Sequence, residues 1–266
     1  STAYRAGSMA TYNVEHVTRV HHWNDRLFSF ATTRDAGLRF ENGHFVMVGL
    51  EIDGKRVARA YSIASANHEE QLEFYSIKVP DGRFTPHLQQ IREGDPVLIS
   101  AKPTGTLVIR DLNPGRRLYL LATGTGIAPF VSIIRDPETY ERFEQVILMR
   151  GVRLVDDLAY GTRVVQELYE HEFLGEMARA QLVDYPAVTR EPFRTQGRIP
   201  TLLESGQVAR DLAIPELDPA IDRAMICGSP EMLADTRCML DARGFKVSPG
   251  VGEFGDYVFE RAFVDQ

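Results

Sequence analysis

A run of four residues, Arg59-Ala60-Tyr61-Ser62, combines side chains that suit a ligand with both a phosphate and a flat ring. An arginine offers a planar fork of donors to a phosphate, and a tyrosine offers a face for stacking. Ser62 adds a hydroxyl or backbone donor for a ring nitrogen. Because side chains alternate along a strand, Arg59, Tyr61 and Ser62 can meet one ligand only where the strand bends or ends. Taken alone, the run fits an edge strand with a solvated arginine and a half-buried tyrosine better than a ligand site.

A second candidate is the segment Gly82-Arg83-Phe84-Thr85-Pro86, which predicts the start of a helix. Thr85 suits the N-cap position and Pro86 the first helical position. The free N–H groups and the positive dipole end of a helix favour an anion, and the glycine permits a close backbone approach. A capped helix without a ligand would have the same sequence, so both interpretations stay open here.

A third candidate, Thr123-Gly124-Thr125-Gly126, follows the apolar run 117–122 and precedes an apolar helical stretch that continues to Ile134. A strand, a glycine turn and a helix start form an anion cradle. The turn departs from the G-x-G-x-x-G dinucleotide fingerprint, and similar turns also join strands to helices without any ligand.

Further strands are expected at 146–149, 181–185 and 224–227, separated by helical patterns. The carboxyl ends of parallel strands meet at one edge of a sheet, where ligands bind. The segments that follow these strands should therefore converge on one crevice; they are Gly151-Val152-Arg153, Thr189-Arg190, Gly197-Arg198 and Cys227-Gly228.

Arg190 and Arg198 can pair with the 2′-phosphate that separates NADP from NAD, whereas an NAD enzyme commonly places a carboxylate on the ribose. Glu191, beside Arg190, speaks for the second case. The alternative is that these arginines are ordinary surface residues of an acidic domain, and for Arg153 this alternative is nearly as good. Cys227, at a buried strand end, has the pattern of a small hydrophobic residue.

The elements that must position these residues differ between the two halves of the chain. Short β-rich runs separated by turn residues predict a small antiparallel β-barrel in the first half, with Asp53-Gly54 as a hairpin turn; the runs are 17–20, 27–32, 45–50, 57–63, 72–79, 97–100 and 107–109. Beyond the expected linker 111–115, strands alternate with helices and predict an α/β domain with a parallel sheet. We therefore expect a disordered lead at 1–8 and two domains, 9–112 and 113–266.

Length and composition limit the number of domains and the classes of partner. The chain has 266 residues, 44% hydrophobic residues and a formal net charge of −7, enough apolar content for two ordinary domains. Residues 9–112 carry 12 basic and 13 acidic side chains, and residues 113–266 carry 17 and 24. This balance argues against nucleic-acid binding but allows a local positive patch for an acidic protein partner.

The two cysteines, Cys227 and Cys238, form no CxxC pair, so neither a disulfide framework nor an iron–sulfur cluster is expected, and no metal site is predicted. No apolar run approaches the roughly 18 residues that span a bilayer, and no signal peptide is recognised, so we expect a cytoplasmic protein without a membrane segment.

Taken together, these blocks resemble the ferredoxin–NADP reductase family. Arg59 to Ser62 matches its flavin signature R-x-Y-S, Gly82 to Thr85 matches its G-x-x-[ST] element, and Thr123 to Gly126 matches its nucleotide loop. The resemblance covers nearly the whole chain from Met9. It is nearest to the bacterial ferredoxin or flavodoxin reductases, because of the run 59–65 and the C-terminal run 260–264.

The resemblance implies FAD as cofactor and NADP(H) as substrate. The implied FAD residues are Arg59, Ala60, Tyr61, Ser62, Tyr75, Arg83, Phe84, Thr85, Thr125 and Ala262. The implied NADP residues are Thr123, Gly124, Gly126, Val152, Arg153, Thr189, Arg190, Arg198, Cys227 and Gly228. Catalytic positions are implied for Ser62, Cys227, Glu260 and Ala262, with Cys227 acting through packing beside the nicotinamide.

The apolar tail alternates like a docked strand. Glu260 matches a family glutamate, while Ala262 stands where plant-type relatives have a terminal tyrosine on the flavin. Residues 263–266 are expected to reach toward the adenine side of FAD.

The resemblance further implies single-electron exchange with an acidic ferredoxin or flavodoxin by a monomeric enzyme. Two alternatives share most of these residues: an NAD(P)H-dependent flavin or oxygenase reductase with a small acceptor, and a non-catalytic redox-sensing or nucleotide-binding module.

Overall fold

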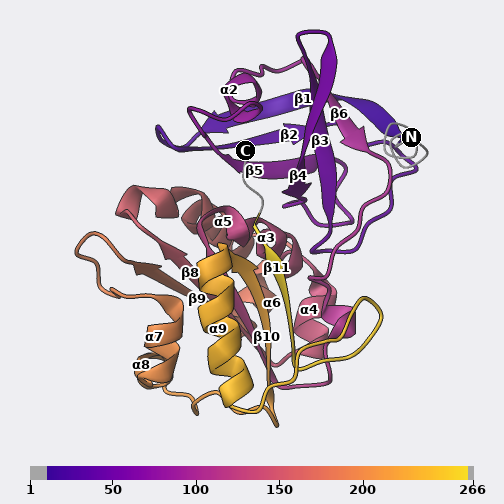
Figure 1. Ribbon diagram of the computed structural model, residues 1–266. Coiled ribbons are helices and arrows are strands. Elements are labelled where there is room, and N and C mark those ends of the chain that lie inside the picture. The colour runs from indigo at the N-terminus through magenta and orange to yellow at the C-terminus, as the bar shows by residue number, and fades with distance from the viewer. Residues whose placement is uncertain (1–10, 263–266) are drawn as a thin grey trace.

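The computed structural model describes residues 11–262, arranged as two bodies that pack against each other (Figure 1). The expected lead at 1–8 and the expected docking of 263–266 lie outside the described residues. Within the described range, no helix is long and apolar enough to cross a membrane.

The N-terminal body is one six-stranded antiparallel sheet in the order β4-β3-β6-β1-β2-β5. Its strands are β1 (Tyr12–His22), β2 (Leu27–Thr32), β3 (Phe45–Ile52), β4 (Lys55–Ser62), β5 (Leu72–Ile77) and β6 (Pro96–Ser100). The sheet curls so that its two ends approach, and the Ala64 N–H donates to the Glu73 carbonyl at 2.8 Å just beyond β4. The predicted antiparallel barrel is confirmed as a half-barrel.

The turn residues and the buried aromatic residues of the sequence explain how this sheet forms. Asp53 and Gly54 both have positive φ, 51° and 76°, which suits the two-residue hairpin turn predicted between β3 and β4. Aromatic side chains, among them Phe28, Phe30 and Phe74, fill the concave face. The short helix α2 (Thr85–Leu88) closes one end of this core through Leu88.

Three details of the prediction are wrong. Residues 107–109 form no strand. Leu107 and Val108 are buried without pairing to a sheet, and the 3-10 helix η1 (Ile109–Asp111) follows. The N-cap of α2 is Phe84, because the Thr85 hydroxyl turns back to bond the backbone of Val79. Strand β1 begins before the predicted 17–20, since its polar first half is held by pairing with β6 rather than by burial.

The C-terminal body is a five-stranded sheet in the order β11-β10-β7-β8-β9, and all of its strands are parallel, which confirms the predicted parallel sheet. Its strands are β7 (Arg117–Thr123), β8 (Gln145–Val152), β9 (Leu182–Val188), β10 (Asp222–Gly228) and β11 (Tyr257–Arg261). Alternation along β7 sends Leu118 and Leu120 to one face and Tyr119 and Leu121 to the other.

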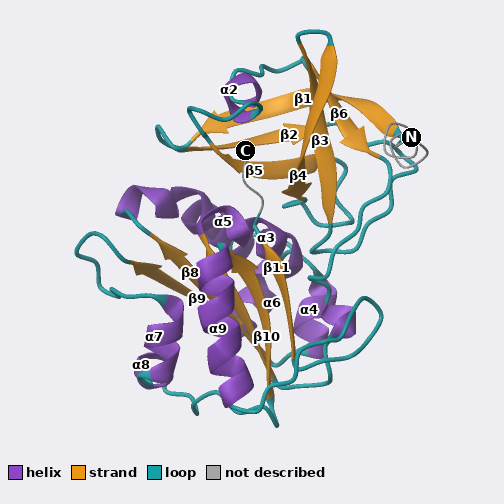
Figure 2. Cartoon of the chain, viewed as in Figure 1, coloured by secondary structure: helices purple, strands orange, loops and turns teal. Residues whose placement is uncertain are grey.

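Each face of this sheet is covered by helices (Figure 2). One face packs against α3 (Ala128–Ile134), α4 (Pro137–Arg142), α5 (Ala159–Tyr169) and α6 (Gly175–Gln181). The other packs against α7 (Ile199–Glu204), α8 (Gln207–Leu212) and α9 (Pro230–Ala242). Short 3-10 helices η2 (Gly124–Ile127) and η3 (Val155–Leu158) follow β7 and β8.

The connection between the two bodies is ordered. The Asn113 N–H donates to the Gly255 carbonyl at 2.8 Å, and Leu112 forms a bridge with Gly255 and is fully buried. The linker is therefore held against the segment before β11. The domain boundary after residue 112 stays a prediction.

Candidate functional site

A pocket lies where the two sheets face each other. The ends of β4 and β5 form one wall, and η2, α3, the end of β10 and the residue after β11 form the other. The residues that line it are Arg59, Ala60, Tyr61, Ser62, Tyr75, Ser76, Ile77, Thr85, Thr125, Ala128, Cys227 and Ala262. Strand β4 ends at Ser62, which is how Arg59, Tyr61 and Ser62 reach one space despite alternating along the strand.

Tyr61 is fixed at this wall by a polar and an aromatic contact. Its hydroxyl lies 2.9 Å from the hydroxyl of Ser76, which donates onward to the Ile77 carbonyl. The Tyr61 ring meets Phe74 edge-on with centroids 6.4 Å apart. The ring can therefore present an orientation set by the protein to a flat ligand.

Two of the residues predicted for the flavin site do not line this pocket. Phe84 is fully buried behind it, with the Arg59 guanidinium 5.9 Å from the centre of its ring, and so supports the wall from the back. Arg83 is exposed at the start of α2. The structure adds Ser76, Ile77 and Ala128, which no motif singled out.

The glycine turn after β7 packs directly on the end of β10. A Cβ at Gly126 would lie 2.4 Å from the Cys227 carbonyl oxygen, and one at Gly228 would lie 2.3 Å from the Thr123 hydroxyl. Gly124 has φ 55° and open space around it. Only glycine allows these close approaches, so Thr123, Gly124, Gly126, Cys227 and Gly228 form one surface at the edge of the sheet.

Cys227 is buried and faces the pocket from the second domain. Burial raises the pKa of its thiol far above the usual range, and the nearby Glu260 carboxylate adds to the effect. The group therefore stays a neutral thiol, as expected of a packing residue.

Glu260 lies opposite Cys227 in the β10–β11 register and reaches back to the first domain. Its Oε2 accepts from the Thr106 N–H at 2.9 Å and from the Thr106 hydroxyl at 3.0 Å. Its Oε1 is buried without a hydrogen-bond partner among the described residues. Burial raises the pKa of this carboxyl above its usual value, although both bonds from Thr106 oppose the rise.

The ends of β8 and β9 come together at the same edge of the sheet. The Thr189 N–H donates to the Val152 carbonyl at 3.0 Å, and the Arg190 N–H donates to the Arg153 carbonyl at 2.9 Å. The side chains of Arg153, Thr189 and Arg190 are exposed there. The structure thus brings together the predicted nucleotide segments that follow β8 and β9.

Arg198 returns to this edge because Val188 and Gln196 form a bridge and the Gly197 N–H donates to Val188. Its guanidinium pairs with Asp235 of α9 at 2.7 Å. The Glu191 carboxylate accepts from the Val155 N–H at the start of η3, so it is engaged in capping.

These residues fit a flavin dinucleotide between the sheets. The pocket combines an arginine, an oriented aromatic ring, hydroxyls and a glycine turn, and opposite its Cys227 the Glu260 carboxylate has a buried oxygen without a partner among the described residues. A ligand with a phosphate, a ring and a hydrogen-bonding edge can contact all of these groups.

A second cavity, of about 650 Å³, opens elsewhere along the seam of the domains. Its walls are mainly apolar side chains of α5 and of the segment after it, and Arg135 and Glu69 lie at its border. It contains none of the residues that the motifs indicated.

Two known domain families match the chain. An oxidoreductase FAD-binding domain matches residues 12–109, and an oxidoreductase NAD-binding domain matches residues 120–238. The two ranges correspond to the half-barrel and to most of the parallel α/β body.

Individual proteins match over nearly the full length. A ferredoxin–NADP reductase of Pseudomonas aeruginosa is 58% identical over 97% of this chain and 100% of its own, and one of Azotobacter vinelandii is 56% identical with the same coverage. The crystal structure of a ferredoxin NADP+ reductase from Neisseria gonorrhoeae with bound FAD and NADP superposes with a TM-score of 0.85 at 30% identity, covering 95% of this chain and 99% of that one. The chain is therefore an oxidoreductase and belongs to the ferredoxin–NADP reductase family.

Proposed function

We propose that the protein transfers reducing equivalents between NADP(H) and an acidic ferredoxin or flavodoxin through FAD bound in the pocket between its sheets. The observation that carries this is the convergence of Arg59, Tyr61 and Ser62 with Thr125, Cys227 and Ala262 around one space. FAD supplies hydride exchange with a nicotinamide and single-electron exchange with a carrier. The protein orients the FAD and tunes its electronic properties.

On the first domain, Arg59 pairs with a phosphate of the cofactor and Tyr61 stacks on its ring. Ser62, at the end of β4, donates to a ring nitrogen.

Other residues complete and support this site. Thr85 and Thr125 complete it, and Phe84 supports Tyr61 and Arg59 from behind. Arg83 adds an exposed positive charge near the diphosphate. Ala60 and Tyr75 contribute wall contacts.

On the second domain, Thr123, Gly124, Gly126 and Gly228 form the surface on which the nucleotide lies. Cys227 packs beside the nicotinamide, and Ala262, tied to the Gly228 carbonyl through its N–H at 2.9 Å, covers the flavin from the opposite side. Glu260 lies opposite Cys227 and places a carboxyl near the reacting atoms, where burial raises its pKa and so favours the neutral form more than in water.

Arg190 and Arg198 give the preference for NADP(H), with Val152, Arg153 and Thr189 forming the rest of the adenosine end. A 2′-phosphate replaces the Asp235 carboxylate as the partner of Arg198. Loss of one charge-assisted contact costs about 1.5–3 kcal/mol, which corresponds to about one to two decades in affinity.

Arg190→Ala should therefore raise KM for NADPH by about ten- to a hundredfold and change KM for NADH little. Arg194→Ala is the matched control, because Arg194 is exposed in the same loop and lies over the Phe193 ring. Equal effects of Arg190→Ala on both nucleotides would remove Arg190 from the phosphate site.

The carrier binds where basic side chains border the pocket. His22 lies opposite Phe28, and Phe28 lies opposite Ser76 of the pocket wall. Burial, followed by repulsion from Lys78 and His21, lowers the pKa of His22. Lys78, directly after Ile77 of the pocket wall, places a fixed positive charge on this side of an acidic chain, which suits an acidic protein.

We further propose a monomer in the cytoplasm. Purified protein should be yellow or become so on addition of FAD, and size-exclusion chromatography should give the mass of one chain. Protein that never binds FAD would overturn the proposal as a whole.

A further inference from the structure

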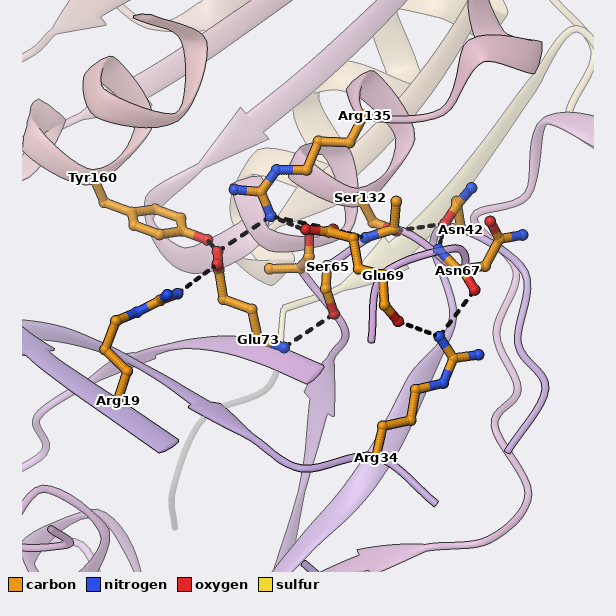
Figure 3. A network of polar contacts seen from close by, with 12 residues as sticks. Arg19, Arg34, Asn42, Ser65, Asn67, Glu69, Glu73, Ser132, Arg135 and Tyr160 are labelled. Atoms are coloured by element: carbon orange, nitrogen blue, oxygen red, sulfur yellow. Dashed lines mark hydrogen bonds and ion pairs between the residues drawn. The ribbon is translucent and has the colours of Figure 1, made fainter. Parts of the chain in front are cut away.

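A polar network at the seam of the two domains has no part in the roles described so far (Figure 3). Its centre is Glu73 of β5. The Glu73 Oε2 accepts from the Tyr160 hydroxyl of α5 at 2.5 Å and from Arg135, just after α3, at 3.4 Å. Its Oε1 accepts from Arg19 of β1 at 3.2 Å. One carboxylate of the first domain thus binds two side chains of the second.

The backbone of Glu73 holds the segment that follows the strand of Arg59, Tyr61 and Ser62. The Glu73 N–H donates to the Ser65 hydroxyl at 3.0 Å, and its carbonyl accepts from Ala64 at 2.8 Å. Arg135 also donates to the Ala64 carbonyl at 3.2 Å. The end of β4 is therefore linked to the second domain through Glu73 and Arg135.

Tyr160 makes a second contact across the seam through its ring. The ring stacks on Tyr75 with centroids 4.1 Å apart and planes at 16°, and it meets Trp23 edge-on at 5.6 Å. Tyr75 lies two residues after Glu73 on β5 and belongs to the pocket wall. Burial raises the pKa of the Tyr160 phenol well above its usual value, so the hydroxyl remains a donor to Glu73.

Transfer between a nicotinamide and a flavin requires the reacting atoms at about 3–3.5 Å, and a misplacement of about 1 Å can cost about a hundredfold in rate. In the proposed function, the two reacting rings are held by different domains. The relative placement of the domains is then part of the catalytic geometry, and contacts across the seam determine it.

We propose that Tyr160 is a positioning residue, which sets the nucleotide crevice against the flavin pocket through its hydrogen bond to Glu73 and its stack on Tyr75. This rests on the proposed function, because positioning has a rate consequence only if hydride crosses the seam. The electron carrier approaches the first domain, so its reaction does not depend on this alignment.

Tyr160→Phe removes the hydroxyl and keeps the ring. In FAD-loaded protein, the rate of flavin reduction by NADPH should fall on the order of tenfold. FAD content, the dissociation constant for NADP+ and the rate of electron delivery to the carrier should stay within about twofold of wild type, because none of these needs the rings aligned.

Tyr140→Phe is the matched control. Tyr140 is also buried in the second domain, but its hydroxyl donates at 2.6 Å to the Ile134 carbonyl of the same domain. Loss of the Tyr140 hydroxyl should leave the rate of flavin reduction unchanged. A purely structural role for Tyr160 predicts equal rates for the two variants at temperatures where both are folded.

Amide hydrogen exchange provides a readout that is independent of turnover. Tyr160→Phe should speed exchange in residues 64–73, and Tyr140→Phe should not, since the Tyr160 hydroxyl bonds Glu73 and the Tyr140 hydroxyl bonds the Ile134 carbonyl. Glu73→Gln tests the same contact from the other side: it keeps an acceptor for Tyr160 but loses the charge that pairs with Arg135 and Arg19. It should therefore speed exchange in residues 64–73 and slow flavin reduction less than Tyr160→Phe does.

If Tyr160→Phe matches Tyr140→Phe in both flavin reduction and exchange, Tyr160 is not a positioning residue. If wild-type holoprotein is not reduced by NADPH at all, the proposed function fails instead, and exchange in residues 64–73 alone decides whether Tyr160 holds the seam.

Discussion

Burial decides what the ionisable residues around the pocket can do. Cys227 and Glu260 are neighbours in the β10–β11 register, and for both of them loss of solvent disfavours the charged form. The thiol stays protonated, whereas the carboxyl has one oxygen bonded to Thr106 and the other without a partner among the described residues.

The two cysteines should differ sharply toward a thiol reagent. Cys238 is exposed on α9, while Cys227 is buried and burial raises the pKa of its thiol. Since the thiolate is the reactive form, native protein should label at Cys238 only, and Cys238→Ser should abolish rapid labelling. Rapid loss of a second thiol before unfolding would show that Cys227 is accessible.

Glu260 should make stability depend on pH in a defined direction. Because the folded-state pKa lies above the usual 4.5, the folded protein binds more protons than the unfolded chain between the two values. The contribution of Glu260 to stability is therefore greatest at low pH and falls as pH rises through this window.

Urea unfolding of wild type and Glu260→Gln across this window measures the effect. The stability of the wild type relative to the variant should decrease as the pH is raised. A difference that stays constant would mean that Glu260 titrates as an ordinary exposed carboxyl, and one that grows with pH would mean that folding lowers its pKa.

The chemistry of the pocket was readable from residue types, but the partners of its residues were not. The types of Arg59, Tyr61 and Ser62 suit a phosphate and a flat ring, but it was the family resemblance that favoured this interpretation over an ordinary edge strand. Thr106 bonds Glu260 across 154 positions, and Tyr160 bonds Glu73 across 87. A threonine in a loop and a tyrosine on a helix carry no local pattern that predicts such contacts.

At the scale of elements, the pocket depends on where strands end. Strand β4 stops at Ser62, and β7 passes into η2 at a glycine turn that packs on β10. The end of β7 was predicted because a glycine turn follows a buried run, whereas the predicted strand 57–63 extended one residue beyond the end of β4. The run 107–109 was wrongly predicted as a strand, because an apolar segment buried between domains has the same composition as a strand.

Two glycines at the edge of the parallel sheet should respond oppositely to alanine. At Gly126 a methyl group would collide with the Cys227 carbonyl, so Gly126→Ala should destabilise by about 1–3 kcal/mol and weaken NADP+ binding. At Gly151 the nearest atoms would be 3.5 Å away, an ordinary contact, so Gly151→Ala should be neutral or stabilising by up to about 1 kcal/mol. Thermal unfolding and nucleotide titration of both variants check this; equal effects would contradict the packing described for η2.

At the scale of the whole molecule, the proposed function needs two domains held in a fixed relative placement and a charged surface on which the carrier can bind. The two-domain architecture was predictable from the change of period near residue 111, whereas the alignment of the bodies depends on seam contacts that no sequence pattern marks. The second half is acidic and the first half nearly neutral, so the charge of the molecule is uneven and can orient a charged partner.

Reduction of an acidic carrier should therefore weaken with salt. Opposite charges steer association less as the screening length shortens to about 10 Å near 0.1 M ionic strength. Steady-state turnover with ferredoxin or flavodoxin should fall as salt is added, while turnover with a small uncharged acceptor should change little. Equal salt responses would point to a reductase that uses a small acceptor.

The most direct test is anaerobic stopped-flow mixing of FAD-loaded protein with NADPH, followed by mixing of the reduced protein with oxidised ferredoxin or flavodoxin from the same cell. The absorbance of the bound flavin should bleach with NADPH, much more slowly with NADH, and should recover as the carrier is reduced. A flavin that is bound tightly but neither bleached by NADPH nor reoxidised by any carrier would contradict the proposed reductase function.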